Sequence, residues 1–305
     1  MIAYVLRRLL QSMFAFVGLL ALVFFLTRMT GDPSYLYLPQ NANEAQRAAF
    51  SAQHGFNDPV VVQFGRYVGD LMRLDFGTSL RQHRSAMDIA LEAFPTTLKL
   101  AATAMLIAFS LAVIVGSLAA YRVGGLFDRM ASIVSLAAGS APDFWVAIVG
   151  ILLFAATLGW LPTSGTNGFE YWIMPIIVLV LRPFGLLVQV VRGTMIGALA
   201  SPYVKTAQAK GVSDRAIIFV HALRNSMLAT VSVAGDLAIS LVNGAVIVET
   251  IYGWPGIGRL MIDAITQRDF PVVQSTILVT ATAVLVINIA IDVIYSALDP
   301  RIRHV

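Results

Sequence analysis

The chain has 305 residues, of which 58% are hydrophobic and 12% charged, with a net charge of +4 and no cysteine. Soluble domains carry about 25% charged residues, so this composition excludes an ordinary soluble protein and indicates an integral membrane protein. The missing cysteines exclude disulfides and thiolate metal sites, and the lack of a basic patch interleaved with aromatic residues argues against a nucleic-acid partner.

Apolar segments long enough to cross a bilayer recur along the chain, since about 20 residues span about 30 Å of hydrocarbon. In chain order they are residues 9–26, 97–121, 130–158, 172–191, 228–251 and 272–295. The first follows Arg7 and Arg8 but lacks a cleavage site, so we expect a retained span and not a signal peptide. In the third, Pro142 removes a backbone donor and is expected to kink the helix or to separate a lead-in turn from the span.

Lysine and arginine predict the orientation of the spans. They gather before the first span, between the second and third, between the fourth and fifth, and after the sixth, whereas the link between the third and fourth has none. Six spans place all these clusters on one side, so both termini and the loop 200–227 are predicted to be cytoplasmic. The expected organisation is a tail and first span (1–29), a periplasmic helical cap region (30–95) and a five-helix core (96–305).

Local signals place helices in the predicted cap region. Asn43 is a plausible N-cap and Gly55 a stop for one helix, and Ser85 with Asp88 forms a capping-box-like pair at the start of another.

Motifs for catalysis are lacking in the sequence. It contains no phosphate-binding P-loop, no G-x-S-x-G elbow and no H-E-x-x-H pair. The histidines His54, His83, His221 and His304 fall on different loops, so we expect no metal site. The glycine-rich "GWPGIG" (253–258) follows no strand, and we interpret it as a turn after the fifth span, with its tryptophan at the headgroup level, in preference to a phosphate site.

Polar residues inside the spans are informative because each is costly in hydrocarbon unless it is paired or wet. Arg182 and Asp236 lie at similar depth, and we expect them to pair with each other or to line a wet pathway. Asn243 is either an interhelical hydrogen-bond partner or part of that pathway. Together with Glu249, these residues are the candidates for a translocation path.

Residues 200–227 form a polar and basic interruption between apolar spans. It predicts a helix, a turn at Gly211 and a second helix capped by Ser213. Small side chains such as Thr206 and Ala207 suit the close approach of a partner. A positively charged loop lying on anionic lipid is the equally weighted alternative from the residues alone.

The segment "YVKTAQAKGVSDRAIIFVHALRNSM" resembles the cytoplasmic EAA loop of bacterial ABC-importer permeases. More closely, the chain resembles the permease family for dipeptides, oligopeptides, nickel and glutathione. Further motifs of that family follow in order over nearly the whole chain: "YVLRRLLQ", "GDP", "DFGTSLR", "GWLPTSG", "ETIYGWPGIGRLMIDAITQRDFPVVQ" and "LDPRIR".

The resemblance implies an all-α integral membrane protein of the type I ABC-importer permease fold, with six transmembrane helices, in the bacterial inner membrane. It implies a second permease subunit, two ATP-binding subunits that hold ATP and Mg, and a periplasmic substrate-binding protein. This chain itself is then not an enzyme and binds no cofactor. The resemblance makes residues 200–227 the coupling loop, on which the ATP-binding subunits dock. The implied docking residues are Tyr203, Lys205, Thr206, Ala207, Lys210, Gly211, Val212, Ser213 and Arg215.

Two departures from the general EAA pattern stand out. Lys205 takes the place of its glutamate, and residues 200–202 lack the acidic side chains expected before the loop. Peptides are the expected cargo, with nickel, glutathione, oligosaccharides or opines as alternatives. A stand-alone secondary transporter or channel is the alternative function. It predicts repeated halves with broken helices, and no such repeat is evident in the sequence.

Overall fold

The computed structural model describes residues 41–298 apart from 54, 74 and 80, and before them positions 14, 17, 18, 20–22, 24, 25, 34 and 38. The side chains of 292–298 are outside this description. Most of the predicted first span, "YVLRRLLQ", "GDP" and most of "LDPRIR" therefore lie outside the described residues.

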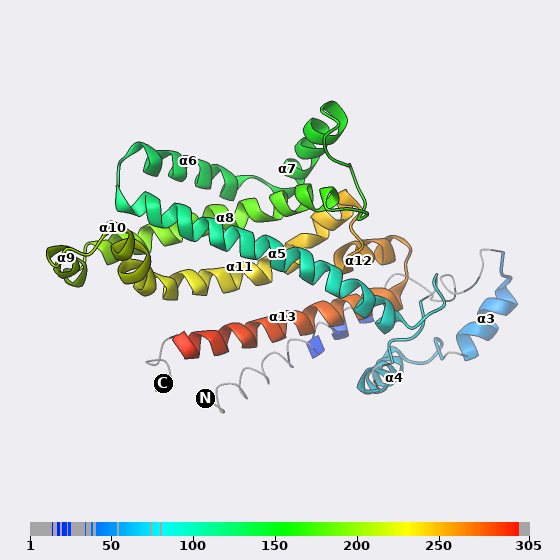
Figure 1. Cartoon of the computed structure of the whole chain (residues 1–305). Helices are drawn as coiled ribbons and strands as arrows, with labels where there is room; N and C mark the ends of the chain where they lie inside the picture. The colour runs from blue at the N-terminus through cyan, green and yellow to red at the C-terminus, as the bar shows by residue number, and fades with distance from the viewer. Residues whose placement is uncertain are drawn as a thin grey trace. The chain divides into compact units, whose positions relative to one another are not determined.

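Helices account for all the named elements of the described residues (Figure 1). In chain order they are α3 (Glu44–Gln53), α4 (Val60–Met72), α5 (Ala86–Tyr121), α6 (Leu126–Ser140), α7 (Asp143–Gly150), the π-helical turn η1 (Ile151–Thr157), α8 (Glu170–Leu199), α9 (Pro202–Ala209), α10 (Asp214–Ala216), the π-helical turn η2 (Ile217–Ala222), α11 (Leu223–Tyr252), α12 (Ile257–Thr266) and α13 (Phe270–Leu298).

Contacts divide the chain into two compact units. The first holds the residues up to Pro95 together with Arg259–Leu285, and the second holds Thr96–Gly258 together with the residues from Val286 onward. The first unit thus ends where the predicted cap region ends, but it also takes in a segment that follows the fifth span. α5 and α13 each contribute residues to both units.

Helices that could cross a membrane match the predicted spans after the first. They are Ala86–Tyr121, Glu170–Leu199, Asp214–Tyr252 and Phe270–Ile291, together with the bent pair Leu126–Ser140 and Asp143–Thr157. The predicted kink at Pro142 is confirmed and is a complete break: the two helices meet at 99°. Proline lacks the N–H that would continue the helix, and it disfavours helical backbone at the residue before it.

In the first unit, the predicted caps are present. Asn43 and Gln46 form a reciprocal capping box, with the backbone N–H of Gln46 donating to Asn43 Oδ1 over 2.8 Å and that of Asn43 to Gln46 Oε1 over 3.0 Å. The N–H of Asp88 donates to Ser85 Oγ over 3.3 Å. The helix that starts there does not stop before the span: α5 runs through Pro95 into the membrane segment. The sequence reading missed α4, which follows Pro59 and has no side-chain cap.

Two motifs quoted for the family resemblance meet inside the first unit. Ser79, in "DFGTSLR", donates its hydroxyl to Asp269 Oδ2 over 2.5 Å, and both residues are buried. Ala86 and Ile89 at the start of α5 pack with Val272 and Val273 in the same unit.

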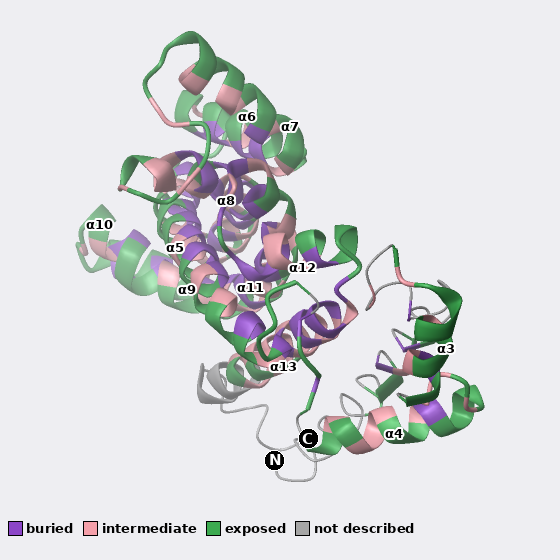
Figure 2. Cartoon of the chain, turned by 90° about the vertical axis from the view of Figure 1, so that its right-hand side faces the viewer, coloured by how far each residue is buried: buried purple, intermediate pink, exposed green. Residues whose placement is uncertain are grey.

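In the second unit, α8 is rich in buried residues (Figure 2); it packs against α6 and α11 and shares apolar clusters with α5. Glycines permit the closest approaches. A Cβ added at Gly185 would lie 2.3 Å from the carbonyl oxygen of Ser135 and 2.5 Å from the backbone nitrogen of Gly139, both on α6. Small residues at such contacts let helix backbones approach in a bilayer, where packing, and not the hydrophobic effect, drives association. Beside this contact, Gln189 Nε2 donates to Ser135 Oγ over 2.6 Å.

One polar clamp joins the same two helices near their other ends. Arg192 on α8 binds the carboxylate of Asp128 on α6 through two nitrogens, one of them at 2.9 Å. The N–H of Gly124 donates to the same carboxylate over 2.8 Å. Because two nitrogens of Arg192 bind the two oxygens of Asp128, the pair fixes the relative orientation of the two side chains as well as attracting them.

We predict that Gly185→Ala destabilises the protein, because its new methyl group meets backbone atoms that side-chain rotation cannot move. Overpacking of this kind costs about 1–3 kcal/mol. Thermal unfolding of the purified protein in detergent measures the effect. Gly193→Ala on the same helix is the matched control, because no atom lies within 4 Å of its added Cβ. Equal midpoints for the two variants would contradict the close contact.

Candidate functional site

The coupling loop begins with a short helix, α9, and a sharp turn. Pro202 occupies the first turn of α9, where its missing N–H costs no helical hydrogen bond. Gly211 has φ +75°, and the N–H of Val212 donates to the carbonyl of Ala207 over 3.2 Å. This bond and the left-handed glycine are those of a Schellman cap. The predicted turn at Gly211 is confirmed.

Most of the residues predicted for docking are exposed on this loop. They are Tyr203, Lys205, Thr206, Lys210, Gly211, Ser213 and Arg215. Val212 is half-buried, and Ala207 is buried, which corrects the expectation that its small side chain faces a partner. Val204 and Ala207 lie three residues apart and so share the inner face of α9. The exposed face of the loop is therefore polar and basic, and its inner face is apolar.

The loop rests on the ends of membrane helices. Ile218 and Ala222 of η2 pack in one apolar cluster with Ala120 of α5 and with Val191 and Met195 of α8. α9 in turn packs against η2. Ser213 has the extended backbone of an N-cap, but its hydroxyl forms no capping bond, so that part of the expectation is wrong. Packed side chains therefore connect α9, through η2, with α5 and α8.

The predicted path residues divide into an exposed group and a buried one. Arg182, Asp236 and Asn243 are exposed on α8 and α11. Within the described part of the chain, Arg182 and Asp236 form no salt bridge, so the structure does not bring them together as the pairing hypothesis requires.

Glu249, also expected along the path, is completely buried at the end of α11. Its Oε1 accepts a hydrogen bond from the hydroxyl of Thr97, and its Oε2 accepts one from the N–H of Gly258 over 2.8 Å. Thr97 Oγ1 also accepts from the N–H of Ile257 over 2.8 Å. We call Thr97, Glu249, Ile257 and Gly258 the carboxylate clasp. Its carboxylate neutralises the start of α12, where backbone N–H groups lack helical partners.

The clasp explains the glycines of "GWPGIG". A Cβ at Gly256 would lie 2.1 Å from Glu249 Oε1, and one at Gly258 would lie 2.6 Å from the Cα of Val246. The prediction of a turn is confirmed, since Gly253 ends α11 in the left-handed conformation with φ 63°. Trp254 is enclosed by the protein itself. It is 1% exposed and packs edge-on against Trp172, with ring centroids 4.7 Å apart.

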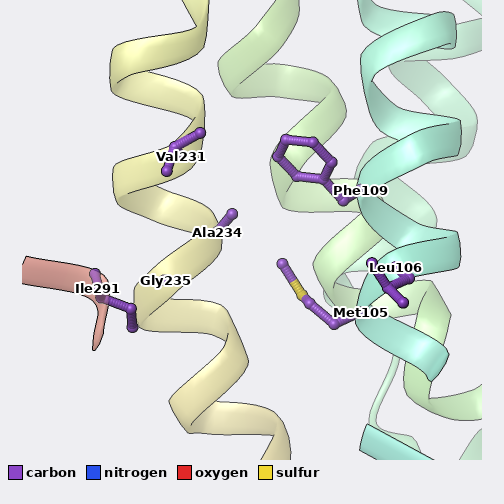
Figure 3. A pocket seen from close by; sticks show the side chains of 7 residues that line it. All are labelled: Met105, Leu106, Phe109, Val231, Ala234, Gly235 and Ile291. Atoms are coloured by element: carbon purple, nitrogen blue, oxygen red, sulfur yellow. The ribbon is translucent and has the colours of Figure 1, made fainter. Parts of the chain in front are cut away.

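An apolar recess of about 240 Å³ also opens in the second unit (Figure 3). It is lined by Met105, Leu106, Phe109, Val231, Ala234, Gly235 and Ile291. Figure 3 shows Met105 and Phe109 of α5 directed toward Ala234 of α11. Among the described residues, those that line this recess are all uncharged.

Residues 112–304 match the family described as "Binding-protein-dependent transport system inner membrane component". The di/tripeptide transport system permease DppB of Pseudomonas aeruginosa is 36% identical over 334 residues, covering 100% of this chain and 99% of that protein. The oligopeptide permease AppB of Bacillus subtilis is 32% identical, and the glutathione permease GsiC of Salmonella paratyphi A is 33% identical. Both matches cover 100% of this chain and of the relative.

The chain belongs to this family. It is the membrane permease subunit of a binding-protein-dependent ABC importer and a multi-pass protein of the bacterial inner membrane.

Solved structures bear out the predicted fold of this permease. An inward-facing methionine ABC transporter, MetNI, matches with a TM-score of 0.58 at 17% identity, covering 70% of this chain and 97% of that one. An amino acid ABC transporter matches with a TM-score of 0.54 at 15% identity, covering 69% and 94%. The permease therefore has the type I ABC-importer fold.

Two residues of interest escaped the sequence reading of this permease. Thr97 begins the second predicted span. The signal in the sequence was a residue with a hydroxyl group directly after Pro95 and Thr96, at the start of an apolar run. Asp143 lies inside the third predicted span, and the signal was an acidic residue directly after Pro142. Only in the structure does Thr97 meet Glu249, and only there does Asp143 Oδ2 lie 3.9 Å from the position of a Cβ on Gly244.

We predict that Thr97→Val destabilises the permease, because it leaves a buried N–H and a buried carboxylate oxygen without this partner. An unsatisfied buried group costs about 1–3 kcal/mol. Thermal unfolding in detergent is the measurement. Thr97→Ser keeps the hydroxyl and should recover most of the loss.

Thr103→Val is the control on the same helix. Its hydroxyl is exposed and bonds only to the carbonyl of Lys99, over 2.7 Å, within α5. A Thr97→Val midpoint no lower than that of Thr103→Val would show that the clasp contributes nothing to stability.

Proposed function

We propose that this permease imports di- and oligopeptides, together with a second permease subunit, two ATP-binding subunits and a periplasmic substrate-binding protein. The observation that carries the proposal is full-length similarity, at 32–36% identity, to permeases named for di/tripeptide and oligopeptide transport. ATP and Mg bind to the partner subunits, because this sequence has no phosphate-binding loop.

The coupling loop is the proposed contact with the ATP-binding subunits, on the cytoplasmic side. Its exposed residues lie between Tyr203 and Arg215 and include the cations Lys205, Lys210 and Arg215. The Schellman cap at Gly211 and the apolar inner face make this loop stiff enough to transmit a displacement. Residues 200–202 carry no acidic side chain, so we expect the loop to attract the ATP-binding subunits mainly through its lysines and arginine.

In this proposal, transport results from a conformational change of the spans that the ATP-binding subunits drive through the coupling loop. ATP binding draws the partner subunits together, and α9 passes the motion through η2 to the ends of α5 and α8. The spans alternate between inward-open and outward-open states as rigid bodies. Coupling requires that the ATP-binding subunits contact the loop differently in the two states.

The proposed translocation path runs along the exposed polar residues of the spans. Arg182 lies about 18 Å from one end of α8 and about 26 Å from the other, well inside the membrane segment. A charge at this depth is stable only where it faces water or a partner. Arg182, Asp236 and Asn243 therefore remain candidates, whereas Glu249 is withdrawn because the clasp encloses it.

We predict that Gly211→Pro abolishes ATP-dependent peptide uptake while the permease still inserts. Proline fixes φ near −65°, whereas Gly211 has φ +75°, so the turn of the coupling loop is lost. Uptake into proteoliposomes, with the ATP-binding subunits and binding protein present, measures the effect, and co-purification of the ATP-binding subunits measures docking.

Gly211→Asn is the matched control, because asparagine enters the left-handed region more readily than other residues with a side chain. It should retain most uptake and co-purification. Normal uptake by the proline variant would contradict the docking role of the loop. Failure of the wild-type importer to take up any peptide would contradict the proposed cargo.

A further inference from the structure

Two loops of the first unit are joined by one buried hydrogen bond. The hydroxyl of Ser79 donates to Oδ2 of Asp269, which lies between α12 and α13. The same Ser79 oxygen accepts the backbone N–H of Arg81 over 3.2 Å. Across the loop, the backbone N–H of Ser79 donates to the carbonyl of Arg84 over 2.8 Å. The loop between Ser79 and Arg84 is therefore closed on itself and tied to the turn between α12 and α13.

Arg268 occupies a backbone position that usually belongs to glycine. It follows α12, and its φ of 57° lies in the left-handed region. Its N–H donates to the carbonyl of Ile265 over 3.1 Å, and the N–H of Asp269 donates to the carbonyl of Ala264 over 2.8 Å. These are the two bonds of a Schellman cap, whose left-handed residue is most often glycine because a Cβ is unfavourable there. An arginine at this position therefore has a cost in stability that a glycine would not have.

The loop on the other side of the Ser79–Asp269 bond has the same feature. His83 has φ 52°, and its N–H donates to the carbonyl of Ser79 over 3.1 Å. Among the described residues, His83 and Arg268 are the two with a side chain and a positive φ. Histidine enters the left-handed region more readily than most residues, whereas arginine has no such preference. Strained backbone persists where its surroundings hold it, and it gathers at functional surfaces.

Exposed arginines lie on both loops beside the bond that joins them. Arg84 pairs with Glu92, whereas Arg81 and Arg268 are exposed and form no salt bridge within the described part of the chain. Two consecutive hydrogen bonds connect the backbone nitrogen of Arg81 to Asp269, the neighbour of Arg268. The backbones of the two unpaired arginines are therefore held close together. We call Arg81 and Arg268 the arginine patch.

The arginine patch lies on the periplasmic side in the predicted topology. Arg81 belongs to the predicted periplasmic region, residues 30–95. Arg268 follows α11, which begins in the coupling loop and belongs to a helix long and apolar enough to cross the membrane. The turn with Arg268 therefore comes after that crossing, on the side away from the coupling loop. In the proposed importer, the partner on this side is the substrate-binding protein.

We propose that Arg81 and Arg268 are docking contacts for an acidic face of the periplasmic substrate-binding protein, and that the Ser79–Asp269 bond positions them. A guanidinium group binds a carboxylate in bidentate geometry, which fixes orientation as well as adding attraction. Such recognition needs both arginines at fixed positions, which accounts for an arginine where glycine would be more stable. Attraction to anionic lipid needs charge alone. This inference rests on the proposed substrate-binding protein as a partner.

Binding of the purified substrate-binding protein to the assembled importer tests the arginine patch. The importer is placed in nanodiscs of neutral phosphatidylcholine, and the Kd is measured at low and at high salt with a saturating dipeptide present. Thermal unfolding of the same samples is recorded. Arg81→Gln and Arg268→Gly should each raise the Kd about tenfold at low salt and weaken its salt dependence, because each removes a charge from the contact.

Arg268→Gly separates docking from stability, because the two should move in opposite directions. Glycine relieves the left-handed strain, so the unfolding midpoint should equal or exceed that of wild type while binding weakens. A merely structural role for Arg268 would leave the Kd at the wild-type value. Arg73→Gln is the control for net charge, since Arg73 is an exposed cation at the end of α4 in the same unit. It should leave the Kd unchanged.

The outcomes separate this proposal from the proposed function. If wild type binds the substrate-binding protein and neither arginine variant weakens binding, or Arg73→Gln weakens it equally, the docking role is wrong and the importer function stands. Normal docking by both variants, with less phosphatidylglycerol retained from mixed nanodiscs, would make the patch a lipid contact and overturn the docking role.

Two further results concern the proposed function itself. If the wild-type importer binds no substrate-binding protein, the proposed assembly is wrong, and the docking role is overturned with it. If wild type takes up no peptide yet docks the binding protein through the two arginines, the proposed cargo is wrong and the arginine patch stands.

Discussion

The carboxylate of Glu249 is completely buried, so it must have hydrogen-bond donors, and three segments of the second unit meet where they are provided. Its partners come from the start of the second predicted span and from the first turn of α12, far apart in the chain. Meeting this requirement brings Thr97, the end of α11 and the start of α12 to one point. The adjoining glycines at 256 and 258 follow, because any side chain there would collide with the clasp.

Charge in the membrane segments takes two forms in this permease. Asp128 with Arg192 and Glu249 with its donors are satisfied within the chain, and they hold helices together. Arg182 and Asp236 are exposed and form no such closed pair in the described residues. The paired charges stabilise the fold, whereas an unpaired charge in a membrane segment lowers its stability. The coupling loop adds a third arrangement, in which charges stay in water and an apolar inner face anchors the loop to the spans.

Apolar length and proline position predicted most of the fold. The second to sixth segments were recognisable because about 20 apolar residues are needed to cross the bilayer, and Pro142 was expected to kink its helix or to divide it. Helix ends were less predictable. α5 continues through Pro95, and α4 was missed, because tertiary packing overrides a single proline and the lack of a cap. The turn at Gly211 was predictable since it needs a positive φ that glycine adopts without strain.

The sequence by itself determined the class of protein, its spans after the first, the coupling loop and the family resemblance, because these depend on local composition, periodicity and motif order. Only the tertiary structure decided which polar residues are enclosed and which face outward. Glu249, Arg182 and Asp236 look equivalent in the sequence, yet the first is buried among donors and the others are exposed. Ala207 likewise faces inward. Burial and pairing depend on residues distant in the chain, and no local pattern records them.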